Sequence, residues 1–126
     1  MKYGNKKSIL IVDDDVVTLK TATMILDDRG YEIHSVKSGL DALRFLRRKK
    51  VDLILLDIEM PILNGLKTLE KIRKEHELAD IPVIILTSSN DKETIVSACR
   101  LEITDYIVKP FVPNNLVERV YKVLWK

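Results

Sequence analysis

One stretch of the chain reads Val51-Asp52-Leu53-Ile54-Leu55-Leu56-Asp57, an apolar run that ends in a carboxylate. A run of this length and composition is typical of a strand buried on both faces of a parallel sheet. The carboxyl ends of such strands form the edge at which open α/β sheets bind their ligands. Asp57 is therefore placed where a functional carboxylate is expected.

Three other apolar runs also end in reactive polar groups. These are Asp13-Asp14-Asp15 after residues 9–12, Thr87-Ser88-Ser89 after residues 83–86, and Lys109-Pro110 after residues 106–108. If the four runs are parallel neighbours, their terminal groups meet at a single edge of the sheet. One acidic strand end means little, but four matched ones indicate a site.

Apolar runs alternate with amphipathic segments along the whole chain. The pattern predicts strands at 8–12, 31–36, 51–56, 82–87 and 104–109, and helices at 16–29, 39–49, 65–77, about 90–101 and 114–125. The fourth helix is predicted to open with a capping box at Asn90-Asp91-Lys92-Glu93. Alternation of this kind predicts an α/β fold, a doubly wound five-stranded parallel sheet. The more polar second and fifth strands belong at its edges, which gives the order 2-1-3-4-5.

Length and composition restrict the class of protein. The 126 residues form one domain, residues 1–126, and 46% hydrophobic with 32% charged residues is globular composition. A net charge of +2 gives no argument for nucleic acid. No apolar stretch is long enough to span a bilayer, so we expect a cytoplasmic protein with no direct membrane or nucleic-acid contact. The single Cys99 excludes an internal disulfide, and we expect it to be buried in a helix.

The acidic residues at the predicted edge suggest a metal. Asp13, Asp14 and Asp57 placed together would repel one another without a cation. An incomplete set of oxygen ligands, which leaves room for water and phosphoryl oxygen, favours Mg²⁺. Asp15 immediately precedes a helical segment and is expected to cap it instead.

The remaining groups at this edge suit phosphoryl transfer. Lys109 would supply a fixed positive charge and Thr87 a hydroxyl donor, and backbone N–H groups near residues 58–59 and 88 could add more donors. A carboxylate is a competent nucleophile, and Asp57 is the best candidate. Taken singly, each residue has an ordinary structural explanation: a helix cap, a strand end or a solvated lysine. Only their convergence from separate segments favours a site.

At this point the sequence resembles a known family. The segments that carry the resemblance are residues 9–15, Leu56-Asp57-Ile58-Glu59-Met60-Pro61, Asn64-Gly65, Leu86-Thr87-Ser88 and residues 105–111. Together they resemble the receiver domain of two-component response regulators, including the chemotaxis type, over essentially the whole chain. The resemblance implies a flavodoxin-like (βα)5 sandwich of three layers. It also implies a signalling domain whose only catalysis is its own aspartyl phosphorylation and dephosphorylation.

The resemblance implies a role for each site residue. Asp57 would accept a phosphoryl group from a sensor histidine kinase or a histidine phosphotransfer protein. Asp14 would bind Mg²⁺ directly, Asp13 mostly through water, and Glu59 through its backbone carbonyl. Thr87 would be the switch hydroxyl and Tyr106 the switch aromatic. Lys109 would pair with the phosphate, with a cis peptide bond before Pro110.

Three positions depart from the family pattern. Ile62 stands where glycine is common, and Glu102-Ile103 replaces a common Gly-Ala pair. The loss of that glycine is unfavourable for the end of the fourth helix, because a left-handed φ disfavours glutamate. Glu59 places an acidic side chain beside the metal, where it could change the lifetime of the acyl phosphate in either direction.

Partners follow from the same resemblance. The first helix would face the kinase or phosphotransfer partner, and residues 91–125 would contact a downstream effector or output domain, with a homodimer possible after phosphorylation. The chain is expected to be either a stand-alone regulator or a receiver separated from its output domain.

Two other functions share part of this pattern. A phosphatase of the haloacid-dehalogenase type also uses a strand-tip aspartate and Mg²⁺, but its nucleophile follows the first strand. A flavin-binding module shares the topology, but no phosphate-cradling loop follows the first strand here.

Overall fold

Strands and helices alternate throughout the computed structural model, which describes residues 6–60, 64–88 and 92–125. The strands are β1 (Ser8–Val12), β2 (Glu32–Val36), β3 (Leu53–Asp57), β4 (Val83–Thr87) and β5 (Asp105–Val108). The helices are α1 (Val16–Asp27), α2 (Gly39–Arg48), α3 (Gly65–Lys74), α4 (Lys92–Cys99) and α5 (Pro113–Leu124).

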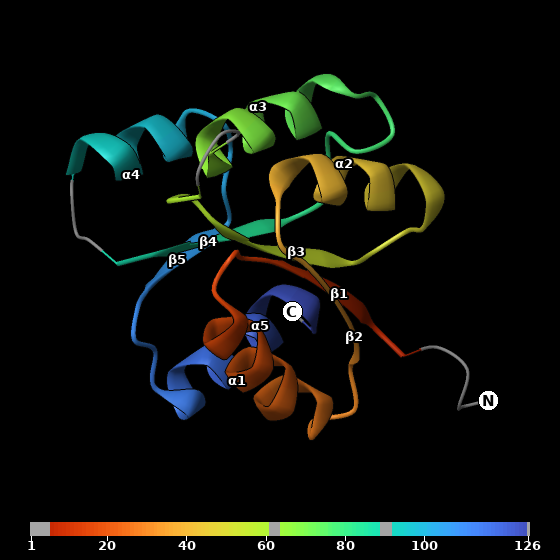
Figure 1. Ribbon diagram of the computed structural model, residues 1–126, viewed down its shortest axis with the longest axis vertical. Helices are drawn as coiled ribbons and strands as arrows, with labels where there is room; N and C mark the ends of the chain where they lie inside the picture. Colours follow the sequence, from red (N-terminus) through yellow and green to blue (C-terminus); the bar gives the residue numbers. More distant parts are fainter. Residues whose placement is uncertain (1–5, 61–63, 89–91, 126) are drawn as a thin grey trace.

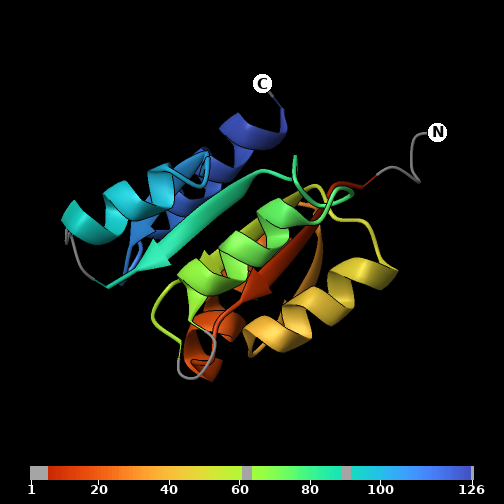
Figure 2. The same cartoon turned by 90° about the horizontal axis from the view of Figure 1, so that it is seen from above.

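The five strands form one parallel sheet in the order β2-β1-β3-β4-β5, as the sequence predicts. Every residue of β1, β3 and β4 is buried, whereas β2 and β5 are only partly buried. The polar strands therefore lie at the edges. All carboxyl ends point the same way, as the arrowheads of β1 (red) and β4 (teal) show in Figure 2.

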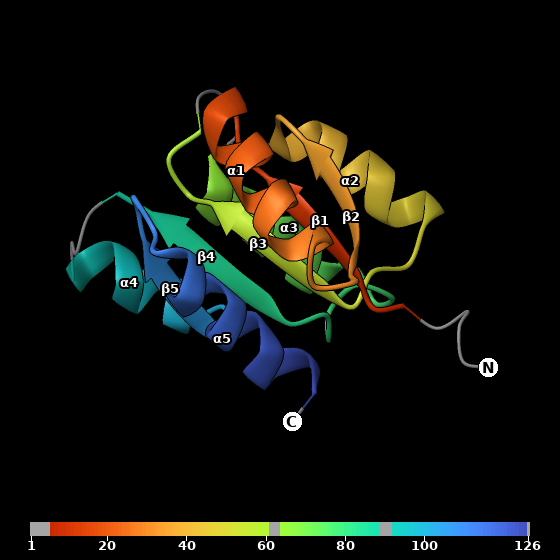
Figure 3. The same ribbon diagram turned by 90° about the horizontal axis from the view of Figure 1, so that it is seen from below.

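Helices cover both faces of the sheet, which gives the predicted three layers. Figure 1 shows α2, α3 and α4 on one side of the sheet and α1 and α5 on the other. The view from below in Figure 3 places α1 and α5 side by side over the strands. No helix within the described ranges is long and apolar enough to cross a membrane.

The central strands serve two separate cores because successive side chains point to opposite faces. In β1, Leu10 and Val12 pack with residues of α2 and α3, while Ile9 and Ile11 pack with residues of α1 and α5. This explains why these strands read as unbroken apolar runs rather than as alternating ones.

Short polar side chains begin three of the helices. The Asp15 carboxylate accepts from the backbone N–H of Val17 at 3.2 Å, so its predicted cap is confirmed. The side chains of Ser38 and Asn64 cap α2 and α3 in the same way. Each cap pairs a backbone donor that the first turn leaves free.

Several sequence predictions need correction. Helices α1, α3 and α4 end two or three residues before their predicted ends, α2 and α5 end one residue before theirs, and β3 extends to include Asp57. Cys99 is exposed, because Ala98 is the residue of α4 that faces the core. In α1, Leu19, Ala22 and Leu26 are buried, whereas Val16 in the first turn is 42% exposed. Asn90 and Asp91 of the predicted capping box, with Pro61 and Ile62, lie outside the described residues.

Glu102 adopts the unfavourable backbone conformation that the sequence indicates, with φ +61°. The guanidinium of Arg73 in α3 supports this turn, because it donates to the carbonyl oxygen of Glu102 at 3.0 Å. The same group donates to three further carbonyls, those of Leu101, Ala79 and Ile81. The fourth helix therefore ends without glycine, with one arginine bonded to the loops before β4 and β5.

Replacing Glu102 by glycine should stabilise the protein, because glycine adopts a positive φ without the clash of a Cβ atom. We expect Glu102→Gly to raise the free energy of unfolding by about 1 kcal/mol, measured by urea denaturation. Gly30, with φ +88° and open space around it, provides the reverse control. Gly30→Ala should lower stability, and a Glu102→Gly protein no more stable than the parent would contradict the strain at this turn.

Candidate functional site

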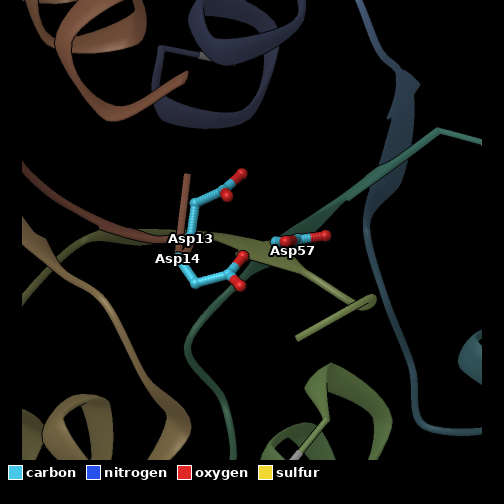
Figure 4. A group of neighbouring side chains, drawn as sticks. All are labelled: Asp13, Asp14 and Asp57. Atoms are coloured by element: carbon cyan, nitrogen blue, oxygen red, sulfur yellow. The ribbon is translucent and has the colours of Figure 1, made fainter. Parts of the chain in front are cut away.

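Three carboxylates from two strand ends meet at one edge of the sheet. Asp13 and Asp14 follow β1 and Asp57 ends β3, and ligand oxygens of all three lie within 4.8 Å of one another. In Figure 4 the three side chains extend from the ends of these neighbouring strands toward one shared space. Asp13 and Asp57 are buried, and Asp14 is exposed. The site is therefore open to solvent on the Asp14 side.

The strand register produces this convergence. β1 and β3 are paired so that Val12 lies beside Leu56, and the next residue on each strand is an aspartate. On the other side of β3, Asp57 is paired with Leu86 of β4. A parallel sheet with this register cannot form without bringing Asp13 and Asp57 together.

Lys109, which directly follows the edge strand β5, brings a positive charge to the carboxylates. Its Nζ donates to Oδ2 of Asp13 at 2.8 Å and lies 3.6 Å from Oδ2 of Asp57. The backbone N–H of Lys109 donates to the carbonyl of Thr87 at 2.7 Å, and the peptide bond to Pro110 is cis, as the family resemblance implies. One ammonium thus contacts two of the three carboxylates, Asp13 and Asp57, which leaves a negative site suited to a hard cation.

The ionised form of Asp57 is electrostatically unfavourable at this position. Burial is the main cause that raises its pKa from the ordinary 3.8 to about 6, and the charge of Asp13 adds to the rise. A hydrogen bond from the Glu59 N–H and the charge of Lys109 act in the opposite direction. Asp57 is therefore a buried carboxyl group whose ionised form the metal-free protein stabilises incompletely.

The same neighbours also shift the pKa of Lys109. Burial lowers the pKa of its ammonium group, but the hydrogen bond to Asp13 and the charges of Asp57 and Asp13 outweigh burial and leave the pKa raised. Lys109 is therefore charged throughout the physiological range. Its closer partner is Asp13, not Asp57.

The oxygen ligands present fit a divalent cation of the Mg²⁺ type. Three carboxylates within reach of one another, one of them exposed, supply hard ligands but not a complete cage. Within the described residues no other group of three acidic, histidine or cysteine side chains meets this spacing. The predicted ligands Asp13, Asp14 and Asp57 are brought together.

The start of α3 packs against the end of β3. The carboxyl end of β3 and Ile58 pack directly on Gly65, where a Cβ atom would clash with the backbone of Asp57 and Ile58. This close approach is a physical reason for glycine at position 65, since no other residue lacks that atom.

The two predicted switch residues occupy different environments. Thr87 is buried at the carboxyl end of β4, beside Val108 of β5. Tyr106 lies on β5 and is 37% exposed, outside the carboxylate cluster. The structure therefore places Thr87 at the edge that carries the site and Tyr106 on the outer surface of the edge strand.

Glu59 makes a contact that sequence reasoning missed. Its Oε1 accepts from the Ser88 N–H at 3.0 Å and from the Ser88 hydroxyl at 2.6 Å. The acidic character of position 59 is the only signal of this contact in the sequence, and it does not identify the partner. The side chain turns toward β4, not into the group formed by Asp13, Asp14 and Asp57.

Comparison with known proteins shows which family this sequence and fold match. A family model described as the response regulator receiver domain matches residues 9–121. The chain is 36% identical, over 95% of its length and 49% of the relative's, to a Cyanophora paradoxa protein named "Probable transcriptional regulator ycf27". It is 33% identical to the CAI-1 autoinducer sensor kinase/phosphatase CqsS of Vibrio cholerae, over 94% of the chain and 18% of that protein.

The fold agrees as closely with solved structures. The chemotaxis protein CheY4 of Vibrio cholerae is similar with a TM-score of 0.91 at 27% identity, over 95% of this chain and all of that one. By contrast, the chain spans about half or less of the two curated relatives above. The similarity therefore covers a complete structural unit but only part of those longer proteins.

Removing the Asp57 charge should stabilise the metal-free protein at neutral pH. Because its pKa is about 6 in the folded protein and near 3.8 when unfolded, the folded state binds more protons between these values. The free energy of unfolding therefore falls as the pH rises from about 4 to about 6, and remains lower above that. We expect Asp57→Asn to raise it by on the order of 2–3 kcal/mol at about pH 7.5 in chelator, and by little at about pH 4.

Urea denaturation at the two pH values measures this difference. Asp52→Asn is the matched control, because Asp52 immediately precedes the opposite end of β3. A stabilisation by Asp57→Asn that did not depend on pH, or that Asp52→Asn reproduced, would contradict the electrostatic explanation.

Proposed function

The chain belongs to the response regulator receiver domain family, and from this we propose that Asp57 accepts a phosphoryl group from a sensor histidine kinase or a histidine phosphotransfer protein. Receiver domains are the signalling domains of two-component systems, so the family itself establishes a signalling role. The observation that carries the assignment to Asp57 is its position. It is a buried carboxylate at the tip of a central strand, with a lysine ammonium 3.6 Å away and two further carboxylates beside it.

The proposed reaction is a transfer between two nucleophiles. A carboxylate oxygen of Asp57 forms a bond to phosphorus while the P–N bond to the donor's imidazole breaks, and the imidazole nitrogen retains the electron pair of that bond. The incomplete stabilisation of the Asp57 charge favours this chemistry, because the acyl phosphate moves negative charge outward from the buried strand tip.

The site would hold Mg²⁺ through Asp13, Asp14, Asp57 and the backbone carbonyl of Glu59. The bound cation would supply electrostatic stabilisation to the transferring phosphoryl oxygens. Asp13 would also position the Lys109 ammonium, because Nζ of Lys109 donates to Oδ2 of Asp13 at 2.8 Å. Lys109 is then held beside the oxygen atoms that Asp57 presents.

Thr87 and Tyr106 would convert the modification into a change of surface. Phosphorylation adds roughly −1.5 to −2 charges at the end of β3. The buried Thr87 hydroxyl is a donor at the neighbouring strand end, and a new bond to a phosphoryl oxygen would bias the loop that follows β4. Tyr106 is half-exposed and one strand farther on, where a movement of that loop changes the space available to its ring.

Two surfaces are available for partners. A groove of about 380 Å³ beside the site is lined by side chains of α1 and of the loop after β5, including Val17, Thr18, Lys109 and Phe111. We propose it as the face that receives the phosphodonor. The described part of residues 91–125 exposes Val96, Tyr106, Tyr121 and Trp125, which supports an effector, an output domain or a second copy as the partner there.

The phosphatase alternative has no support from the fold or the relatives. The family model, the relatives and the CheY4 structure all point to receiver domains. The candidate nucleophile is also on the third strand of the chain, as the sequence indicates, rather than after the first.

Phosphorylation by a small donor tests the assignment of Asp57. We expect acetyl phosphate with Mg²⁺ to add one phosphoryl group, measured by intact-protein mass spectrometry, and Asp57→Asn to abolish it. Asp52→Asn, at the other end of the same strand, should be labelled like the parent protein. Labelling that persisted in Asp57→Asn would show that the acceptor is a different residue.

Loss of Lys109 should separate metal binding from the response to phosphorylation. Lys109→Ala removes a positive charge, so Mg²⁺ affinity should be retained or increase, while the charge that pairs with the phosphoryl group is lost. We expect beryllofluoride with Mg²⁺ to shift the Tyr106 amide resonance in the parent protein and not in this variant. Lys67→Ala, an exposed lysine in the first turn of α3, should respond normally. A normal response from Lys109→Ala would contradict the role given to Lys109.

A further inference from the structure

Glu59 links two loops at the edge of the sheet that carries the site. It lies two residues after Asp57, and its carboxylate binds both the N–H and the hydroxyl of Ser88, the residue after β4. The bonds are 3.0 and 2.6 Å long, and both are made to one oxygen, Oε1. Metal binding by the Glu59 side chain does not explain this arrangement, because that carboxylate is absent from the group that lies within ligand distance.

The donors that Glu59 uses are ones a phosphoryl group would need. Asp57 is paired with Leu86 on β4, and Ser88 stands two residues farther along that strand's direction. A phosphoryl group on Asp57 extends the carboxylate outward by one tetrahedral group, toward the loops that follow β3 and β4. Backbone N–H groups at such a strand end are suitable donors to its equatorial oxygens. In the unmodified protein the Ser88 N–H is already paired with a carboxylate.

We propose that Glu59 competes with the phosphoryl group for Ser88 and holds Ser88 in the unphosphorylated arrangement. The inference rests on the proposed phosphorylation of Asp57. One N–H donates a strong hydrogen bond to one acceptor, so the Glu59 oxygen and a phosphoryl oxygen exclude each other at Ser88. Glu59 is a positioning residue in this scheme, because it acts on the reaction through Ser88.

Phosphorylation would also act on Glu59 directly. Glu59 is close to Asp57 in the chain, and its own N–H donates to Oδ1 of Asp57 at 3.0 Å. A phosphoryl group there places about two negative charges near the Glu59 carboxylate, and like charges repel. Repulsion and competition act in the same direction, because both move the Glu59 carboxylate away from Ser88. The equilibrium between the two arrangements is then set by which anion Ser88 binds.

Binding of beryllofluoride with Mg²⁺, a stable substitute for the phosphoryl group, provides the test. Glu59→Gln replaces the charged acceptor by a weaker neutral one, so we expect the affinity for beryllofluoride to rise by roughly threefold to tenfold. Ser88→Ala removes the shorter of the two bonds without changing any charge and keeps the Ser88 backbone donor. It should also raise the affinity, by roughly twofold to fivefold.

The second variant and the double mutant distinguish competition from simple charge repulsion. If Glu59 acts by competing for Ser88, the effects of Glu59→Gln and Ser88→Ala overlap, and the double mutant gains less than the product of the single gains. The backbone amide at position 88 should exchange its hydrogen faster in unmodified Glu59→Gln than in the parent protein. Asp15→Asn is the control for charge, because it removes a carboxylate from the same edge, keeps the α1 cap and should change the affinity by less than about twofold.

Each other outcome rejects the proposal in a recognisable way. A gain for Glu59→Gln with none for Ser88→Ala means that Glu59 acts through its charge alone. Unchanged affinity in both variants means that the contact only joins two loops. If beryllofluoride binds the parent and Asp57→Asn proteins equally, the proposed function fails and the competition with it. If beryllofluoride binding is lost in Asp57→Asn but its affinity is unchanged in Glu59→Gln and Ser88→Ala, only the competition at Ser88 is rejected.

Discussion

Two buried carboxylates share one ammonium group at the centre of this protein. Asp13 and Asp57 are almost fully buried, and Lys109 lies 2.8 Å from the first and 3.6 Å from the second. Burial is the main cause of the raised pKa of Asp57, and the charge of Asp13 adds to it, because one positive charge does not fully offset two buried negative charges. The metal-free site is therefore under electrostatic strain that a divalent cation would relieve. The proposed binding of a cation and the proposed reactivity of Asp57 have this same origin.

The sheet is what maintains this arrangement. Three central strands, buried over their whole length, determine where the residues beyond their carboxyl ends can lie. The register of β1 with β3 places Asp13 beside Asp57, and the close packing of Gly65 on the end of β3 supports the strand tip. Packed cores on both faces resist small displacements, so the carboxylates cannot separate to reduce their repulsion. The free energy of the cores thus maintains a site that is unfavourable in isolation.

Much of the fold and of the site could be predicted from local pattern. The strand order, the polar edge strands and the meeting of Asp13, Asp14 and Asp57 follow from alternating segments and from the geometry of parallel sheets. The helix ends and the exposure of single residues such as Cys99 and Val16 could not be predicted as well. Apolar periodicity gives the direction of a helix face, but the width of the buried stripe depends on the rotation and distance of the helix over the sheet. Arg73 shows the same limit, because its four carbonyl acceptors come from two loops that have no common sequence signal.

By itself, the sequence determined which chemical groups stand at the end of each strand, because those groups directly follow apolar runs that are typical of buried strands. It thereby determined a cluster of carboxylates with a lysine, a hydroxyl and a candidate nucleophile at Asp57. Only the tertiary structure decided how these groups pair: Lys109 chiefly with Asp13, and Glu59 with Ser88. The physical reason is that strand order and register are long-range properties of the backbone that a repeating pattern encodes. The partner of a flexible charged side chain depends instead on distances of a few ångströms between loops.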